Sequence, residues 1–381
     1  MTSTAPNSQS RLNSIDALRG LAALTIVFYH ARPMFWVGLD QTWKQYGLRP
    51  DINAWLGYAT AIFYFGGVAV DLFFVLSGYC IHRRGAQQLA TNPKAELELK
   101  QYAIRRIWRI YPTYVAALCI TALVDAYVKT NYPAEIMAGQ DNSIFAFAIS
   151  LLGLPGLAAP YFGSNSVLWT LALEMQFYAI YPILFYVSRR YGTVKTLAFS
   201  CCISLIYIGA GLLFDLSNLF PYRGSGSPIF LPYLFTWTFG FYLAEVEAGR
   251  AVLPKNFWLI ASLVISLAVP SYLFNMRDLA IFSWALLSGV LLYWSVSPSG
   301  NNFWSNNFLF RFLPGIGLFS YSLYAIHRPA LLFLKVSILP GSGRFTTLIP
   351  ALIASLVAVI VGWLFFVIIE KRTLKPIVWT K

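Results

Sequence analysis

Apolar runs of about 20 residues recur from one end of this chain to the other, and they constrain its fold more than any other feature. A helix of this length spans the hydrocarbon core of a bilayer, where every backbone polar group must be bonded within its own segment. Only 11% of the residues are charged, roughly half of the fraction in soluble domains. The chain is therefore predicted to be an all-α, polytopic transmembrane helical bundle. The runs lie at 15–36, 58–81, 103–128, 143–158, 167–187, 194–214, 229–246, 256–274, 279–296, 313–336 and 345–369.

Basic residues between the runs predict how the bundle is oriented. Seven Lys and Arg residues lie in the segment 83–109, and such enrichment is typical of cytoplasmic loops. Arg189 and Arg190 mark a second cytoplasmic loop. The number of crossings between these loops must be even, although three apolar runs lie there. We therefore expect the short run 143–158 to be a re-entrant or surface segment, which leaves about ten spans with both termini cytoplasmic.

The apolar runs leave no room for a separate soluble domain. We expect a short disordered cytoplasmic tail at 1–14, a single transmembrane domain at 15–370 and a cytoplasmic tail at 371–381. The net charge of +13 is distributed between the runs and not in one continuous patch, which argues against nucleic acid as a partner. The four cysteines lie in apolar runs without CxxC spacing, so we expect neither a metal site nor a redox site.

Ionisable residues inside the runs indicate function, because they are costly to place in a membrane. Arg19 and His30 are 11 residues apart, which is three helical turns plus about 20°, so they share one helix face. The predicted orientation places His30, Glu174 and His327 in the outer half of the membrane. Asp71 falls near its middle. A neutral imidazole beside a carboxylate can act as a general base, so this group of side chains is a candidate catalytic centre.

Five ordered motifs make the chain resemble the acyltransferase-3 family of bacterial integral-membrane O-acyltransferases. The resemblance extends over almost the whole chain. In the first motif, a basic residue and a histidine are separated by ten residues, as Arg19 and His30 are. The motifs are Ser14–Ala23 with His30, Asp71–Tyr79, Arg105–Pro112, Leu168–Glu174 with Phe177 and Tyr178, and Ser320–His327.

The resemblance implies transfer of an acyl group, most often acetyl, from cytoplasmic acyl-CoA to a hydroxyl of an extracytoplasmic or lipid-linked glycan. Acetyl-CoA is then a substrate, no metal is needed, and the location is the bacterial inner (plasma) membrane. Guanidinium groups bind phosphate through paired hydrogen bonds, so we expect Arg106 and Arg109, with Arg105, to bind the coenzyme A phosphates. Arg19 is expected to guide the pantetheine arm toward His30.

His30 is expected to remove the proton of the acceptor hydroxyl as the hydroxyl attacks the thioester. Glu174 or Asp71 would stabilise the resulting imidazolium. A covalent acyl-histidine intermediate is the alternative, and the spacing does not separate the two routes. We expect His327 to support His30 or contact the acceptor, and Trp169 to shape the acceptor cleft.

Two further residues receive structural interpretations. Ser77 lacks a GxSxG setting, so we interpret Ser77–Gly78 as a close-packing site beside the reaction centre and not as a nucleophile. His82 lies at a predicted cytoplasmic helix end and is expected on the surface. Two-domain members of the family append a soluble hydrolase-like domain after the last span. Only a short tail follows Glu370, so we expect acceptor handling within the membrane part or in a partner.

Other functions remain open at this point. A transporter or flippase for a polysaccharide precursor is also polytopic, but it predicts related halves with matching helix interruptions, which the sequence lacks. A non-catalytic partner in polysaccharide export would need neither His30 nor the arginines. Within the leading hypothesis, the acyl group can be acetyl or succinyl. The acceptor can be an O-antigen, capsule, exopolysaccharide, lipid sugar or macrolide, and the oligomeric state is open.

Overall fold

The computed structural model describes residues 8–373 except 50, 215–228, 275 and 340–342, and this part of the chain forms helices without a named strand. The all-α fold class is therefore confirmed. The first helices are α1 Ser8–Phe35, α2 Leu39–Tyr46, α3 Ile52–Ala59, η1 Ala61–Val68, α4 Ala69–Thr91, α5 Leu99–Asn131, η2 Ala134–Met137, α6 Ile144–Leu151, α7 Leu168–Tyr191 and α8 Thr193–Leu213. The later helices are η4 Leu231–Tyr233, α9 Leu234–Glu247, α10 Phe257–Ser266, α11 Ala268–Leu273, α12 Arg277–Ser295, α13 Pro298–Asn306, α14 Leu313–Leu318, α15 Ser320–Ile338, α16 Ile349–Phe365, η5 Phe366–Glu370 and α17 Lys371–Thr373.

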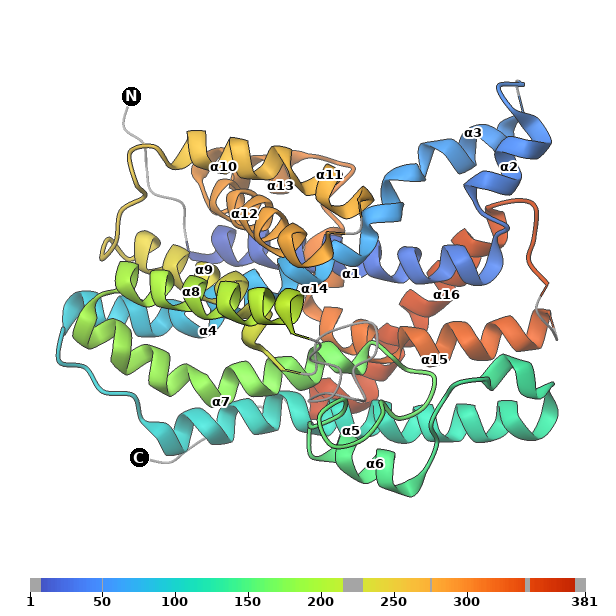
Figure 1. Ribbon diagram of the computed structural model, residues 1–381, viewed down its shortest axis with the longest axis horizontal. Helices are drawn as coiled ribbons and strands as arrows, with labels where there is room; N and C mark the ends of the chain where they lie inside the picture. Colours follow the sequence, from blue (N-terminus) through green and yellow to red (C-terminus); the bar gives the residue numbers. More distant parts are fainter. Residues whose placement is uncertain (1–7, 50, 215–228, 275, 340–342, 374–381) are drawn as a thin grey trace.

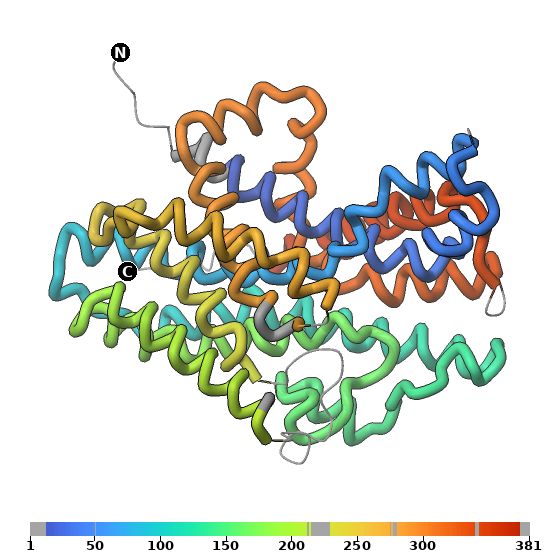
Figure 2. The backbone as a smooth tube through the Cα atoms, turned by 45° about the horizontal axis from the view of Figure 1, so that its top comes forward, coloured from blue at the N-terminus to red at the C-terminus, as the bar shows by residue number. Residues whose placement is uncertain are grey.

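The long helices run roughly along one axis of the molecule (Figure 1). Helices α2 and α3 lie at the end of the bundle where α1 ends, opposite the end where α1 begins (Figures 1 and 2). Helix α1 packs against α4, α14, α15 and α16, so it contacts both early and late segments of the chain. This central position places Arg19 and His30 inside the bundle.

Within the described part of the chain, five helical segments are long and apolar enough to cross a membrane. The bent pair α12 and α13, whose axes differ by 81°, adds a sixth if the pair forms one span. Helix α6 is 8 residues long, too short to cross, and the predicted run 313–336 is divided at Phe319 into α14 and α15. The count of about ten spans and the cytoplasmic termini stay predictions. The five segments are Ile52–Thr91, Leu99–Asn131, Leu168–Tyr191, Thr193–Gly211 and Ile349–Thr373.

The boundaries of the predicted tails differ from those of the helices. Helix α1 begins at Ser8, inside the segment 1–14 that was expected to be disordered. Extending an existing helix costs little, and residues 8–14 contain neither Pro nor Gly to stop it. Residues 371–373 are helical as well. The remaining parts of both predicted tails lie outside the described residues.

Helices α4 and α9 approach so closely that only glycine fits at their crossing. A methyl group on Gly78 would lie 1.9 Å from the carbonyl oxygen of Trp237, and one on Gly240 would lie 1.9 Å from that of Val75. Small residues allow helix backbones to approach in membranes, where van der Waals packing drives helix association. Gly78 is the second residue of the predicted close-packing pair, and its contact joins α4 to α9.

The expected surface position of His82 is wrong, because α9 covers this part of α4. The side chain of His82 is fully buried and stacks on Phe241 with ring centroids 3.4 Å apart. Its Nε2 lies 2.7 Å from Glu245 Oε1, and its Nδ1 lies 3.2 Å from the hydroxyl of Tyr181. Arg250 also pairs with Glu245, at 3.2 Å. The sequence gives the distance of His82 from a helix end but not the helix that packs over it.

We predict that Gly78→Ala destabilises the protein by about 2 kcal/mol, because the added methyl group has to displace backbone atoms of α9. The matched control is Gly209→Ala on α8, where a methyl group would meet nothing within 4 Å. Thermal unfolding in detergent should show a lower midpoint for Gly78→Ala alone. Equal midpoints for the two variants would contradict the close contact.

Candidate active site

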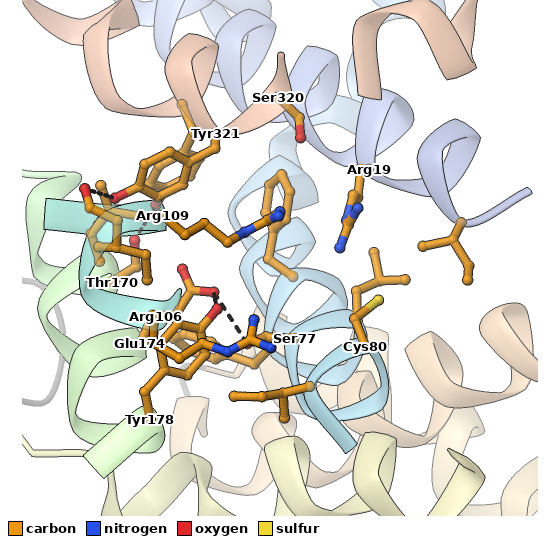
Figure 3. A pocket seen from close by; sticks show the side chains of 18 of the residues that line it. Arg19, Ser77, Cys80, Arg106, Arg109, Thr170, Glu174, Tyr178, Ser320 and Tyr321 are labelled. Carbon is orange, nitrogen blue, oxygen red and sulfur yellow. Dashed lines mark hydrogen bonds between the residues drawn. The ribbon is translucent and has the colours of Figure 1, made fainter. Parts of the chain in front are cut away.

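Helices α1, α4, α5, α7 and α15 enclose a cavity of about 350 Å³, which we call the arginine cavity (Figure 3). Among its described lining residues, four are arginines and two are carboxylates. The charge balance of the lining therefore favours an anionic ligand. Its polar lining residues are Asp16, Arg19, Ser77, Arg83, Arg106, Arg109, Thr170, Glu174, Tyr178, Ser320, Tyr321 and Tyr324.

Three arginines extend into this cavity from two helices. Figure 3 shows Arg19 entering from α1, and Arg106 and Arg109 entering from α5. Arg106 and Arg109 are three residues apart, so they share one face of the helix. The guanidinium of Arg106 lies 5.6 Å from the ring centroid of Tyr178, and its Nε is buried without a hydrogen-bond partner among the described residues. Arg19 donates to Asp16 at 3.1 Å.

Arg105 does not join this group. Its side chain is bonded to Gln101 of its own helix, with Nε 3.2 Å from the main-chain oxygen and Nη2 2.9 Å from Oε1, and both bonds are exposed. Adjacent residues of a helix point about 100° apart, so Arg105 and Arg106 face different surroundings. The structure thus separates Arg105 from the two arginines with which it was grouped.

Close helix contacts hold Arg19 in place. A methyl group on Gly20 would lie 2.2 Å from the carbonyl oxygen of Leu313, and one on Gly317 would lie 1.9 Å from that of Asp16. Helix α14 therefore packs directly against the backbone of α1 beside Arg19. The short α14 ends before α15 begins, and α15 supplies Tyr321 and Tyr324 to the cavity.

Glu174 is fixed within the arginine cavity. Its Oε1 accepts hydrogen bonds from Ser77 at 3.1 Å and from the Tyr178 hydroxyl at 2.6 Å (Figure 3). The indole of Trp237 donates to the Ser77 hydroxyl at 3.3 Å. Ser77 thus links α4, α7 and α9. Among the described residues, Glu174 is bonded to Ser77 and Tyr178, whereas His30 lies in a second cavity.

The second cavity, about 250 Å³ in volume, contains His30, and we call it the histidine cavity. Val70 and Tyr324 line both cavities, so the two are neighbours. Thr170 donates to the hydroxyl of Tyr324 at 2.7 Å, which fixes part of the shared wall. The polar and aromatic lining residues of the histidine cavity are Tyr29, His30, Asp71, Ser166, Trp169, Tyr233, Tyr272, Trp284 and Tyr324.

His30 and His327 are bonded to each other across α1 and α15. Nδ1 of His30 lies 2.9 Å from Nε2 of His327, and the two rings are stacked with centroids 5.1 Å apart. His327 is fully buried, and its Nδ1 lies 2.8 Å from the carbonyl oxygen of Tyr324. The chain thus fixes His30 through a second histidine that is itself bonded to the backbone.

The structure therefore divides the predicted site residues between two cavities. Arg19, Arg106, Arg109, Glu174 and Ser77 line the arginine cavity, whereas His30, Asp71 and Trp169 line the histidine cavity. Within the described part of the chain, no group of three or more His, Cys, Asp or Glu side chains is arranged to hold a metal ion.

The aromatic residues of the histidine cavity that the sequence analysis did not find include Tyr272 and Trp284. Tyr272 comes from α11 and Trp284 from α12, and both helices lie outside the five motifs. In an apolar run rich in aromatic residues, nothing in the local pattern distinguishes a cavity-lining tryptophan from a lipid-facing one. Only the packing of α11 and α12 against the rest of the bundle brings them to this cavity.

Several named proteins are similar to this chain. Peptidoglycan O-acetyltransferase OatA of Listeria monocytogenes is 28% identical over 221 residues, which cover 56% of this chain and 29% of that protein. A putative membrane-bound transacylase, BcsY, of Komagataeibacter xylinus is 30% identical over 183 residues, or 45% of this chain and 36% of that protein. A putative O-acetyltransferase of Staphylococcus aureus is 26% identical over 176 residues, or 45% of this chain and 24% of that protein.

The chain thus matches between 24% and 36% of the length of these three relatives. No solved structure matches it. The sequence model of the acyltransferase-3 family, described as an acyltransferase domain, matches residues 12–367, and this range includes every residue that lines the two cavities. The chain therefore belongs to the acyltransferase-3 family, and both cavities lie within its acyltransferase domain.

Proposed function

We propose that this protein is a membrane O-acyltransferase that moves an acetyl group from cytoplasmic acetyl-CoA to a hydroxyl of an extracytoplasmic or lipid-linked glycan. The observation that carries the proposal is the adjacency of the two cavities. One has the positive charge that an anionic donor requires, and the other contains a histidine positioned as a base. The names of the relatives, two of them O-acetyltransferases, support the acetyl group as the cargo.

The arginine cavity is the proposed donor site. Coenzyme A carries phosphates at one end and a long thin arm at the other, and Arg106 and Arg109 present guanidinium groups on one helix face for the phosphates. The arm would extend past Arg19 toward the shared wall at Val70 and Tyr324. The positive-inside pattern of segment 83–109 supports donor entry from the cytoplasm.

The hydrogen bonds of the two histidines favour His30 as the base. A carbonyl oxygen only accepts, so His327 must carry its proton on Nδ1, and Nε2 of neutral His327 is then an acceptor. His30 must therefore donate from Nδ1, which leaves the lone pair of its Nε2 unused by this pair. A base on one defined nitrogen is what removal of a hydroxyl proton requires.

The proposed reaction is a direct transfer. The acceptor oxygen attacks the thioester carbon as its proton moves to His30 Nε2, and the carbon–sulfur bond then breaks. Coenzyme A leaves as the thiolate, which takes the proton from the imidazolium. Asp71 lines the same cavity as His30, so we assign stabilisation of the imidazolium to Asp71. Glu174, bonded to Ser77 and Tyr178, instead shapes the donor cavity.

Activity tests the proposal directly. We predict that His30→Ala lowers the rate of acetyl transfer at least 100-fold, because general base catalysis contributes about 100-fold or more. We predict a large loss for Arg19→Gln as well. The measurement is the transfer of labelled acetyl from acetyl-CoA, supplied on the cytoplasmic side of membranes, to a glycan fraction. Arg105→Gln is the control, because that side chain is exposed. Wild-type labelling by a folded His30→Ala variant would contradict the role of His30.

The affinity for coenzyme A distinguishes the roles of Arg105, Arg106 and Arg109. We predict that Arg106→Gln and Arg109→Gln each weaken coenzyme A binding about 10-fold, since a hydrogen bond to a charged group contributes about 1.5–3 kcal/mol. Arg105→Gln should leave the dissociation constant within about twofold, as for other surface substitutions. Equilibrium dialysis with labelled coenzyme A measures all three. Equal losses for the three variants would exclude the arginine cavity as the specific donor site.

The histidine tautomers can be observed without substrate, because the chain contains only three histidines. We predict that ¹⁵N NMR of histidine-labelled protein shows His30 protonated on Nδ1 and unprotonated on Nε2. In the His327→Ala variant, His30 should be a mixture of its two neutral tautomers instead of this single one. The variants His82→Gln and His327→Ala assign the signals. A wild-type His30 protonated on Nε2 would contradict the proposed base.

A further inference from the structure

The histidine cavity contains two buried polar atoms that lack a hydrogen-bond partner among the described residues. They are Oδ1 of Asp71 and Nε1 of Trp284, and Asp71 as a whole is only 7% exposed. Leaving such an atom buried and unbonded costs about 1–3 kcal/mol, and more when the group is charged. Two such atoms in one cavity beside His30 indicate that a ligand supplies their partners.

The two atoms need opposite hydrogen-bond partners. An ionised carboxylate oxygen only accepts a hydrogen bond, and an indole N–H only donates one. A hydroxyl group can serve either atom. A ligand with two hydroxyl groups on one rigid framework satisfies both atoms at once. The polar lining thus favours a polyhydroxylated ligand.

The remaining lining is aromatic. Tyr29, Trp169, Tyr233 and Tyr272 contribute rings to the same cavity, and the centroids of Trp169 and Tyr233 are 5.9 Å apart. A sugar ring has hydroxyl groups around its edge and apolar C–H groups on its faces. Aromatic side chains bury apolar surface against such faces, and a few placed polar groups fix the orientation, as in many small-ligand sites. The volume of about 250 Å³ suits one sugar ring.

We infer that the histidine cavity binds one sugar ring of the acceptor, with Asp71 and Trp284 as its two polar anchors. Asp71 Oδ1 accepts from one hydroxyl, and Trp284 Nε1 donates to the oxygen of another. A further hydroxyl then faces His30. The inference rests on the proposed function only in naming the sugar as the acceptor, because binding itself requires no acyl transfer. It gives Trp284, which no sequence motif contains, a role in acceptor specificity.

The test measures sugar binding independently of catalysis. The full chain is placed in lipid nanodiscs, and saturation-transfer NMR is recorded with methyl glucoside, methyl galactoside and methyl N-acetylglucosaminide. We expect at least one glycoside to bind the wild type. Asp71→Asn keeps the size and shape of the side chain, and Trp284→Phe keeps an aromatic ring but removes the indole N–H. Each should weaken that binding about 10-fold.

The matched control is Trp294→Phe on the same helix α12. Trp294 lies outside the histidine cavity and packs against Phe303 and Trp304, so the glycoside affinity of this variant should equal that of the wild type. Size-exclusion chromatography checks that each variant is folded. If no glycoside binds the wild type, or if folded Asp71→Asn and Trp284→Phe bind as the wild type does, the inference is overturned.

Acetyl transfer from labelled acetyl-CoA in the same nanodiscs distinguishes this inference from the proposed function. Glycoside binding that depends on Asp71 and Trp284, without transfer to any acceptor, would support the sugar site and contradict the proposed reaction. Transfer with an unchanged acceptor KM in both variants would contradict the sugar site and leave the proposed reaction standing. An acceptor KM raised about 10-fold, with the acetyl-CoA KM unchanged, supports both.

Discussion

A charged or polar side chain inside an apolar bundle must be paired, and this constraint determines how the interior of the protein is arranged. Asp125 shows the constraint fully met. It is buried and accepts hydrogen bonds from the backbone N–H of Ser164 at 2.8 Å, from the Ser164 hydroxyl at 2.5 Å and from Asn142 at 2.7 Å. These bonds tie the segments on both sides of α6 to α5. Such pairing makes the exceptions informative. Asp71 Oδ1 and Trp284 Nε1 in one cavity, and Arg106 Nε in its neighbour, have no hydrogen-bond partner among the residues that the structure describes.

Backbone contacts at glycine hold the arginine cavity in place. Gly78 and Gly240 let α4 and α9 touch, and Gly20 and Gly317 let α14 touch α1. Because interiors are packed at nearly crystalline density, each contact leaves little freedom in the relative position of two helices. The first contact lies next to Ser77, which donates to Glu174, and the second lies next to Arg19. Close packing thus sets the positions of polar side chains on the adjacent residues.

The sequence predicted the helical class and several of the residues that line the cavities, but not how these residues are divided between the two cavities. Arg19 and His30 lie on one helix as the spacing required, yet they line different cavities because α4 and α15 contribute Val70 and Tyr324 between them. Membrane depth grouped Glu174 with His30, but depth says nothing about direction around the bundle. The burial of His82 and the place of Trp284 have the same explanation, since each depends on a helix distant in sequence.

The arrangement of the two cavities also bears on the choice between direct transfer and an acyl-histidine carrier. A carrier is needed when donor and acceptor cannot meet, because it moves the acyl group between separate sites. Here the cavities share Val70 and Tyr324, and Thr170 fixes the hydroxyl of Tyr324. A thioester in the arginine cavity and an acceptor hydroxyl in the histidine cavity would lie on the two sides of this shared wall. His30 then needs only to move a proton, a task for which its bond to His327 leaves Nε2 available. The geometry therefore favours direct transfer.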